Sequence, residues 1–159
     1  MRRSLLRGIV RGTAFLSLAG VMIALITVVA PLSTRARVIL RRLWARGTAA
    51  ILGFRILKSG EPFRACPALY VSNHSSYLDI VVLASVLDAT FIAKSEVAGW
   101  PFFGLVAKVG GTMFVRRHWR QALVQRNALA ARMRAGESFC LFGEGTSTNG
   151  MDVKPFKTS

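Results

Sequence analysis

The apolar and polar positions of the chain divide it into two parts with different periodicity. From residue 12 to residue 34 no charged residue occurs, and these 23 positions are enough for a helix across the roughly 30 Å of a bilayer core. After Pro67, short apolar runs alternate with stretches of helical periodicity, which is the pattern of an α/β domain. We therefore predict an N-terminal membrane helix followed by an α/β domain.

The α/β part is predicted to alternate between strands and helices. Strands are expected at about 68–72, 90–93, 112–115 and 138–142. Helices are expected near 76–87, 102–109 and 118–135. Gly136 follows the last of these helices and suits a helix C-terminus, because it lacks a side chain.

Residues 36–58 connect the two parts and place apolar residues at helical spacing, with Arg37, Arg41, Arg42 and Arg46 among them. One interpretation is a basic amphipathic helix at the membrane interface, where each cation near an anionic surface contributes about 1 kcal/mol. The other is a helix whose apolar face packs on the domain. The expected boundaries are 1–34 for the anchor, 35–64 for the interfacial helix and linker, and 65–159 for the α/β domain.

Composition and charge strengthen the membrane interpretation. Hydrophobic residues make up 52% of the chain, mean hydropathy is +0.42 and the net charge is +15. Residues 1–64 carry twelve basic residues against one acid, Glu61, so eleven of the fifteen net charges lie beside the apolar segment. This distribution favours an anionic membrane surface over nucleic acid as the partner.

The apolar segment has one competing interpretation, a cleaved export signal preceded by Arg2 and Arg3. The segment is longer than the apolar core of a normal signal and no Ala-x-Ala follows it, so we favour an anchor. Arginines on its two sides nearly balance, so a spanning helix and a hairpin within one leaflet both stay open.

The cysteines indicate a reducing compartment. Cys66 and Cys140 form no Cys-x-x-Cys motif and no cluster with zinc-ligand spacing. We therefore expect no disulfide framework and no structural metal.

Candidate chemistry begins where the first predicted strand runs into Asn73-His-Ser-Ser-Tyr-Leu-Asp79. A carboxylate one turn into the following helix can hold His74 in one tautomer, which leaves the other ring nitrogen to accept a proton from an alcohol. Taken alone, a structural histidine fits the same spacing.

Two further clusters follow later strands. Gly111-Thr-Met-Phe-Val-Arg116 ends in an arginine, whose planar fork suits an anionic head group, although a solvated strand end gives the same pattern. Phe142-Gly-Glu-Gly-Thr146 lacks the lysine of a P-loop and the glycine spacing of a dinucleotide fold. Glu144 and Thr146 can nevertheless bind hydroxyls at the carboxyl end of a strand.

In this order, Asn-His-x4-Asp at 73–79, Gly-x-x-Phe-x-Arg at 111–116 and Phe-x-Glu-Gly-Thr at 142–146 resemble the PlsC-like glycerolipid acyltransferase family. That family includes the 1-acylglycerol-3-phosphate and the lyso-ornithine lipid acyltransferases. The resemblance implies a catalytic pair in which His74 is the general base and Asp79 orients it. It also implies the following substrate-binding residues: Arg116, Glu144, Gly145 and Thr146.

The resemblance further implies transfer of a fatty acyl group to the free hydroxyl of a lysolipid, first 1-acylglycerol-3-phosphate to give phosphatidic acid, with lyso-ornithine lipid as the alternative. An acyl-CoA or acyl-acyl carrier protein thioester would be the co-substrate, with no bound cofactor and no metal. The expected location is the cytoplasmic membrane, with the domain facing the cytoplasm and anionic lipids as partners.

The chain departs from the family pattern at three places. Gly143 stands where proline is common, Ser147 stands where arginine often follows Glu-Gly-Thr, and a fourth, proline-containing motif is not found before Ser159. We therefore expect an acyltransferase domain that is incomplete at its C-terminus. A hydrolase is disfavoured because no Gly-x-Ser-x-Gly occurs, and a non-enzymatic basic membrane-binding module is the rival from another class.

Overall fold

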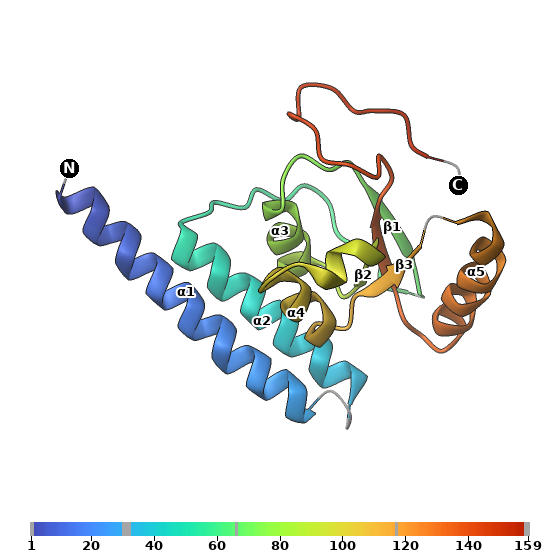
Figure 1. Cartoon of the computed structure of the whole chain (residues 1–159), viewed down its shortest axis with the longest axis horizontal. Coiled ribbons are helices and arrows are strands. Elements are labelled where there is room, and N and C mark those ends of the chain that lie inside the picture. Colours follow the sequence, from blue (N-terminus) through green and yellow to red (C-terminus); the bar gives the residue numbers. More distant parts are fainter. Residues whose placement is uncertain (1, 30–32, 66, 117, 158–159) are drawn as a thin grey trace.

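A computed structural model of the chain describes residues 2–29, 33–65, 67–116 and 118–157. Two long helices, α1 (Arg2–Val29) and α2 (Thr34–Leu52), lie side by side and antiparallel along one flank of a small α/β domain (Figure 1). Helix α2 lies between α1 and α3, and α1 also contacts α4 of the domain directly.

The domain is built on a parallel four-stranded sheet in the order β1-β4-β2-β3. Its strands are β1 (Leu69–Ser72), β2 (Thr90–Lys94), β3 (Met113–Val115) and β4 (Phe139–Phe142). Its helices are α3 (Leu78–Val86), the 3₁₀ helix η1 (Ser95–Gly99), α4 (Phe103–Val109) and α5 (Trp119–Arg134). The predicted α/β class is confirmed.

The predicted strands and helices of the domain agree with the structure to within two residues at each end, and Gly136 takes φ 95° just beyond α5 as expected. The helix predicted over 36–58 is wrong in its last six residues, because α2 ends at Leu52. Gly53 adopts φ 78° there, and its N–H bonds back to the carbonyls of Ala49 and Ala50. The short helix η1 was not predicted.

Helix α1 packs on α2 through a narrow stripe and leaves most of its apolar surface uncovered. Ala19, Met22 and Ile26 are buried, and Gly47 of α2 allows close approach, since a Cβ there would lie 2.8 Å from Leu18 Cδ2. The segment Ser4–Val29 is long and apolar enough to cross a membrane, yet only 17% of its most apolar window is buried in the protein. This exposure distinguishes α1 from the core helix of a soluble protein and fits association with a membrane.

Arginines attach α2 to the domain. The buried Arg41 donates through Nη2 to the carbonyl of Ala89 at 2.6 Å and through Nη1 to that of Gly110 at 3.2 Å. Arg46 Nε donates to the carbonyl of Ser85 at 3.2 Å. Burial lowers the pKa of Arg41 to about 10, so this guanidinium stays charged at neutral pH. We call the Arg41 and Arg46 contacts the arginine joint; they match the interpretation in which α2 packs on the domain.

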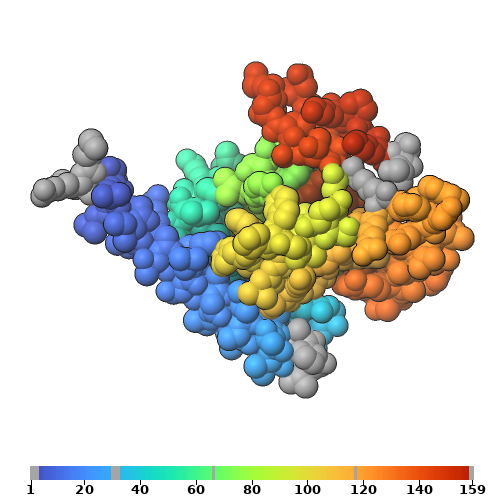
Figure 2. Space-filling view, in the orientation of Figure 1, coloured from blue at the N-terminus to red at the C-terminus, as the bar shows by residue number. Residues whose placement is uncertain are grey.

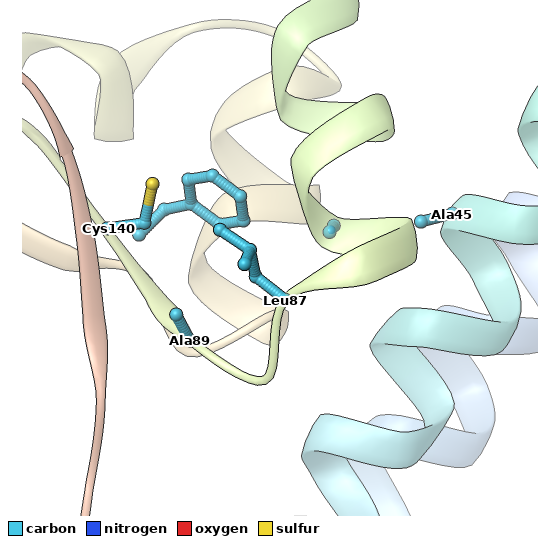
Figure 3. Close-up of a cluster of buried hydrophobic side chains, with 6 residues drawn as sticks. Ala45, Leu87, Ala89 and Cys140 are labelled. Atoms are coloured by element: carbon cyan, nitrogen blue, oxygen red, sulfur yellow. The ribbon is translucent and has the colours of Figure 1, made fainter. Parts of the chain in front are cut away.

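The core lies where α2 and α3 meet the sheet. Its buried residues are Ala45, Ala84, Leu87, Ala89, Phe91 and Cys140. Figure 3 shows Ala45 of α2 facing α3, with Leu87, Ala89 and Cys140 on the side of the sheet. Burial raises the pKa of the Cys140 thiol to about 11, so this cysteine is an inert core residue. Cys66 lies outside the described residues.

Candidate functional site

The candidate site lies at the carboxyl edge of β1 and β4, which are neighbours in the sheet. Their register pairs Ser72 with Phe142, and the N–H of Gly143 donates to the carbonyl of Ser72 at 3.0 Å. The segments that leave these two strands therefore begin side by side. One carries the predicted catalytic pair and the other carries Glu144, at the edge where ligands of parallel sheets bind.

His74 and Asp79 form a hydrogen-bonded pair, with 2.9 Å between Nδ1 and Oδ2. The same Oδ2 accepts the N–H of Ser75 at 2.7 Å and that of Ser76 at 2.9 Å. Partial burial acts to raise the pKa of Asp79, but the hydrogen bonds from Ser76, His74 and Ser75 outweigh it and lower this pKa below its ordinary value. Asp79 is therefore an ionised acceptor, which fixes the proton of the neutral ring on Nδ1 and leaves the Nε2 lone pair to act as a base.

The imidazole ring is also held by aromatic contacts. It stacks on Phe142, with 3.9 Å between ring centroids and 19° between ring planes, and Tyr77 approaches it edge-on at 6.4 Å. Only 12% of the His74 side chain is exposed. Sequence reasoning missed this role of Phe142, although Phe142 is the first residue of the Phe-x-Glu-Gly-Thr motif.

The loop after β4 holds the loop after β1 in place. Thr148 donates twice to the carbonyl of His74, from its N–H at 2.8 Å and from Oγ1 at 3.3 Å. Asn149 Oδ1 accepts the N–H of Met151 at 3.1 Å. Thr148 and Asn149 therefore make hydrogen bonds within the loops of the site. Ser147, which precedes them, is exposed, and none of the hydrogen bonds found among the described residues involves its side chain. Sequence reasoning missed the positioning contact of Thr148.

Glu144 is only 1% exposed, and neither of its carboxylate oxygens accepts a hydrogen bond from any residue the structure describes. Buried polar atoms in folded proteins are nearly always hydrogen-bonded, so this carboxylate stands out at the site, but its oxygens are covered and not open to a ligand in this conformation. Next to it, Gly145 takes φ 66°, which favours glycine, and Thr146 is exposed.

Gly143, the departure from the proline common in the family pattern, is explained by the segment that packs over it. A Cβ at this position would lie 2.7 Å from the Phe156 ring. The N–H of Lys157 also donates to the carbonyl of Gly143 at 2.9 Å. The segment around Phe156 therefore occupies the space that a larger residue would need.

Arg116 is not in contact with the catalytic pair. It follows β3, which is separated from β1 by β4 and β2, a width of roughly 14 Å at the usual spacing of strands. Gln125 of α5 holds its backbone with two reciprocal hydrogen bonds of 2.9 Å. The guanidinium is exposed at the same edge of the sheet, so it can reach only a part of a ligand remote from His74. Arg117, beside it, lies outside the described residues.

A small cavity of about 140 Å³ adjoins the pair. It is lined by Ser72, Asn73, Ser75, Asp79, Val82 and Leu83. This volume suits a few water molecules and is far too small for a fatty acyl chain.

The arrangement can deprotonate an alcohol. A hydroxyl at Nε2 of His74 would give up its proton as its oxygen attacks an activated carbonyl, and Asp79 would stabilise the resulting imidazolium. A serine or cysteine nucleophile is not required if the carbonyl arrives already activated.

The chain is similar in sequence to known proteins. A sequence profile of the Acyltransferase family matches residues 55–159. Lyso-ornithine lipid O-acyltransferase of Brucella abortus (strain 2308) is 48% identical over 115 residues, which are 72% of this chain and 43% of that protein. The 1-acyl-sn-glycerol-3-phosphate acyltransferase of Neisseria gonorrhoeae is 32% identical over 123 residues, 75% of this chain and 48% of that protein.

A solved structure has the same fold. The 1-acyl-sn-glycerophosphate (LPA) acyltransferase PlsC from Thermotoga maritima matches 99% of this chain and 68% of its own with a TM-score of 0.69 and 22% identity. The chain spans less than half the length of the two curated relatives above.

Proposed function

This chain belongs to the acyltransferase family, and from that premise we propose that it transfers a fatty acyl group from a thioester to the free hydroxyl of a lysolipid. The observation that carries the proposal is the His74–Asp79 pair, with 2.9 Å between Nδ1 and Oδ2 and with Asp79 held by two backbone N–H groups. An oriented base of this kind is what an alcohol needs in order to attack a thioester.

The acyl group would pass directly from the thioester to the acceptor hydroxyl. Nε2 of His74 takes the proton of the acceptor hydroxyl while the oxygen attacks the thioester carbonyl, and the negative charge of Asp79 stabilises the imidazolium. The carbon–sulfur bond then breaks, and the imidazolium returns the proton to the departing thiolate. The products are an ester and a free thiol, with no acyl group on the protein.

Lyso-ornithine lipid is the acceptor we favour. The support is the identity of 48% to an enzyme named for that acceptor against 32% to one named for 1-acylglycerol-3-phosphate. The exposed Ser147, where an arginine would suit a phosphate dianion, agrees. 1-Acylglycerol-3-phosphate is the second candidate, because a relative named for that acceptor is 32% identical. The proposed donor is an acyl carrier protein or coenzyme A thioester.

The proposed location is the cytoplasmic membrane, with the site on the cytoplasmic face. Phe102, just before α4, contacts Phe15 near the middle of α1 at 5.9 Å between ring centroids, so the domain flanks the middle of the apolar helix. A helix covered in this way cannot cross a bilayer alone with the domain wholly outside. This supports the hairpin arrangement, with α1 entering one leaflet.

The test is a competition assay with the chain reconstituted in vesicles. Lyso-ornithine lipid and 1-acylglycerol-3-phosphate at equal concentration compete for one labelled acyl thioester, in separate runs with the carrier-protein and the coenzyme A donor. We expect the ornithine product to exceed phosphatidic acid at least tenfold, a difference of about 1.4 kcal/mol in transition-state binding. An excess of phosphatidic acid would reverse the choice of acceptor. If neither product forms, the proposed activity of this chain is rejected.

A further inference from the structure

A continuous series of aromatic contacts runs from the apolar helix α1 to His74. Phe15 of α1 contacts Phe102 at 5.9 Å, and Phe102 contacts Phe103 at 5.5 Å between ring centroids. Phe103 stacks on Tyr77 at 6.2 Å, and Tyr77 approaches the His74 ring at 6.4 Å. The series joins the part of the protein that fits a membrane to the base of the proposed reaction.

The outer side of this series is exposed. We call it the aromatic ridge, formed by Tyr77, Leu78, Trp100, Phe103 and Leu105. Trp100 is the least exposed of the five at 39% and Phe103 the most at 55%. Trp100 contacts Tyr77 at 5.7 Å and Phe103 stacks on the same ring, so the three aromatic members of the ridge are contiguous. A contiguous exposed apolar surface of this kind marks a site of interaction.

The turn before α4 has a strained backbone, and it directs two consecutive phenylalanines to opposite sides. Phe102 has φ 56°, and it is the one non-glycine with positive φ among residues 2–29, 33–65, 67–116 and 118–157. A bulky residue is rarely held there, and such strain gathers at ligand-binding sites. The turn directs the half-buried Phe102 to α1 and the exposed Phe103 to Tyr77. Gly104 keeps α4 close to η1, since a Cβ there would lie 2.6 Å from the carbonyl oxygen of Ala98.

The chemistry of the ridge matches a lipid interface. Tryptophan and tyrosine side chains concentrate at the boundary between acyl chains and head groups, because each has an apolar body and a polar tip. Lys94 directly precedes η1 and Lys108 is in the last turn of α4, so two exposed cations flank in sequence the segment that carries Trp100, Phe103 and Leu105, and they suit anionic head groups. Figure 2 shows that the surface of residues 95–109 adjoins that of α1.

We propose that the aromatic ridge is a second membrane contact, which enters the bilayer interface beside α1 and along which the acyl chain of the lysolipid lies while its hydroxyl reaches His74. The 140 Å³ cavity beside the catalytic pair cannot hold that chain, whereas the ridge leads to the His74 ring from the side of the membrane. The path of the acyl chain rests on the proposed function. The membrane contact does not.

Tryptophan fluorescence tests the membrane contact directly. The chain has three tryptophans, of which Trp44 packs on the core, Trp100 is on the ridge and Trp119 is 77% exposed on α5, across the domain from α1 (Figure 1). Two double variants leave one reporter each: W44F with W119F keeps Trp100, and W44F with W100F keeps Trp119. Both are reconstituted in phosphatidylethanolamine and phosphatidylglycerol vesicles with and without brominated acyl chains.

We expect brominated lipid to reduce Trp100 emission at least about twofold and to leave Trp119 emission nearly unchanged, because bromine quenches only at contact depth. Flotation of the vesicles confirms that both variants are bound. Equal quenching of the two reporters, or none of Trp100 in floating vesicles, would overturn the proposal.

Kinetics test the path of the acyl chain. Phe103→Ser should raise KM for a long-chain lysolipid roughly tenfold with little change in kcat. Phe103→Leu should restore most of the affinity, and Leu123→Ser, which removes a similarly exposed side chain from α5, should leave KM unchanged. An unchanged KM for Phe103→Ser would reject the path. If the wild-type chain shows no transfer at all, the proposed function fails, and the quenching result still decides the membrane contact.

Discussion

The turns after β1 and β3 have similar sequence patterns, but their histidines lie in different surroundings. Each follows a parallel strand, contains a histidine and leads into a helix. His74 has a side chain only 12% exposed and bonded to Asp79. His118 is exposed, and its Nδ1 accepts the N–H of Arg120 at 3.3 Å as the cap of α5. A histidine at a strand end thus becomes a base only where other residues orient and cover it.

The covering comes from the neighbouring strand. β1 lies beside β4, whose loop brings Thr148 to the carbonyl of His74, while Phe142 at the end of β4 supports the ring. β3 lies beside β2, which continues into η1. Its turn is held instead by Gln125 from the following helix, which fixes the backbone of Arg116 and leaves its side chain in solvent.

The largest effect should come from exchanging the two histidines for alanine. His74→Ala removes the base, and we expect initial rates of acyl transfer to fall by about 10² to 10⁴. His118→Ala removes only a helix cap, so the rate should change less than about twofold while the free energy of unfolding falls by about 1 kcal/mol at most. Similar losses of rate in both variants would break the comparison.

Asp79→Asn is expected to rank second. The amide keeps the shape of the carboxylate but presents an N–H to the ring or to the N–H groups of Ser75 and Ser76, so the tautomer of His74 is no longer fixed. We expect kcat to fall by roughly 10²-fold with KM little changed, measured at saturating thioester. A normal kcat would show that His74 needs no partner.

The contacts that hold the two turns, from Thr148 to His74 and from Gln125 to Arg116, allow a finer test. Thr148→Val removes the Oγ1 bond to the carbonyl of His74 and keeps the N–H bond, so kcat should fall about twofold to tenfold, with partial rescue by Thr148→Ser. Gln125→Ala releases the backbone of Arg116 and should leave kcat unchanged. If Gln125→Ala lowers kcat as much as Thr148→Val does, the two turns contribute equally to the chemistry.

The smallest effect should appear in stability against acid. Because the folded pKa of Asp79 lies below its ordinary value of 3.8, its stabilising contribution is complete above about pH 4 and is lost as the pH falls through the folded value. Since 28% of the Asp79 side chain is exposed, solvent screens its interactions and this contribution is small. Denaturant titrations between pH 6 and pH 3 should show a shallower loss for Asp79→Asn than for wild type, with His118→Ala following wild type. Parallel curves for wild type and Asp79→Asn would contradict this assignment.

The strands and helices of the domain were predictable because each short apolar run is bounded by polar or glycine residues. The end of α2 was not, since apolar spacing continues past Gly53 to Phe54 and Leu57 although the backbone there leaves the helix. Charge pattern could not decide where Arg41 would lie, because a buried arginine bonded to carbonyls and an interfacial one occupy the same helical positions.

Some residues of the site could likewise be predicted from the sequence, and others could not. The sequence predicted the His74–Asp79 pair because five residues of local chain determine its geometry, and the structure forms this hydrogen bond. It missed Phe142 and Thr148, whose roles depend on β4 being the neighbour of β1. Strand order follows from how the whole sheet packs, and no single motif encodes it.

The arginine joint has a mechanical consequence. Arg41 bonds α2 to the backbone just before β2, at Ala89, and just after α4, at Gly110. The hairpin of α1 and α2 and the sheet are therefore expected to move as one rigid body. With α1 seated in one leaflet as proposed, the depth of that helix sets the height of His74 above the head groups. Thinning or thickening of the bilayer would then raise or lower the reacting ring as a unit, and membrane thickness would tune which hydroxyl comes within its reach.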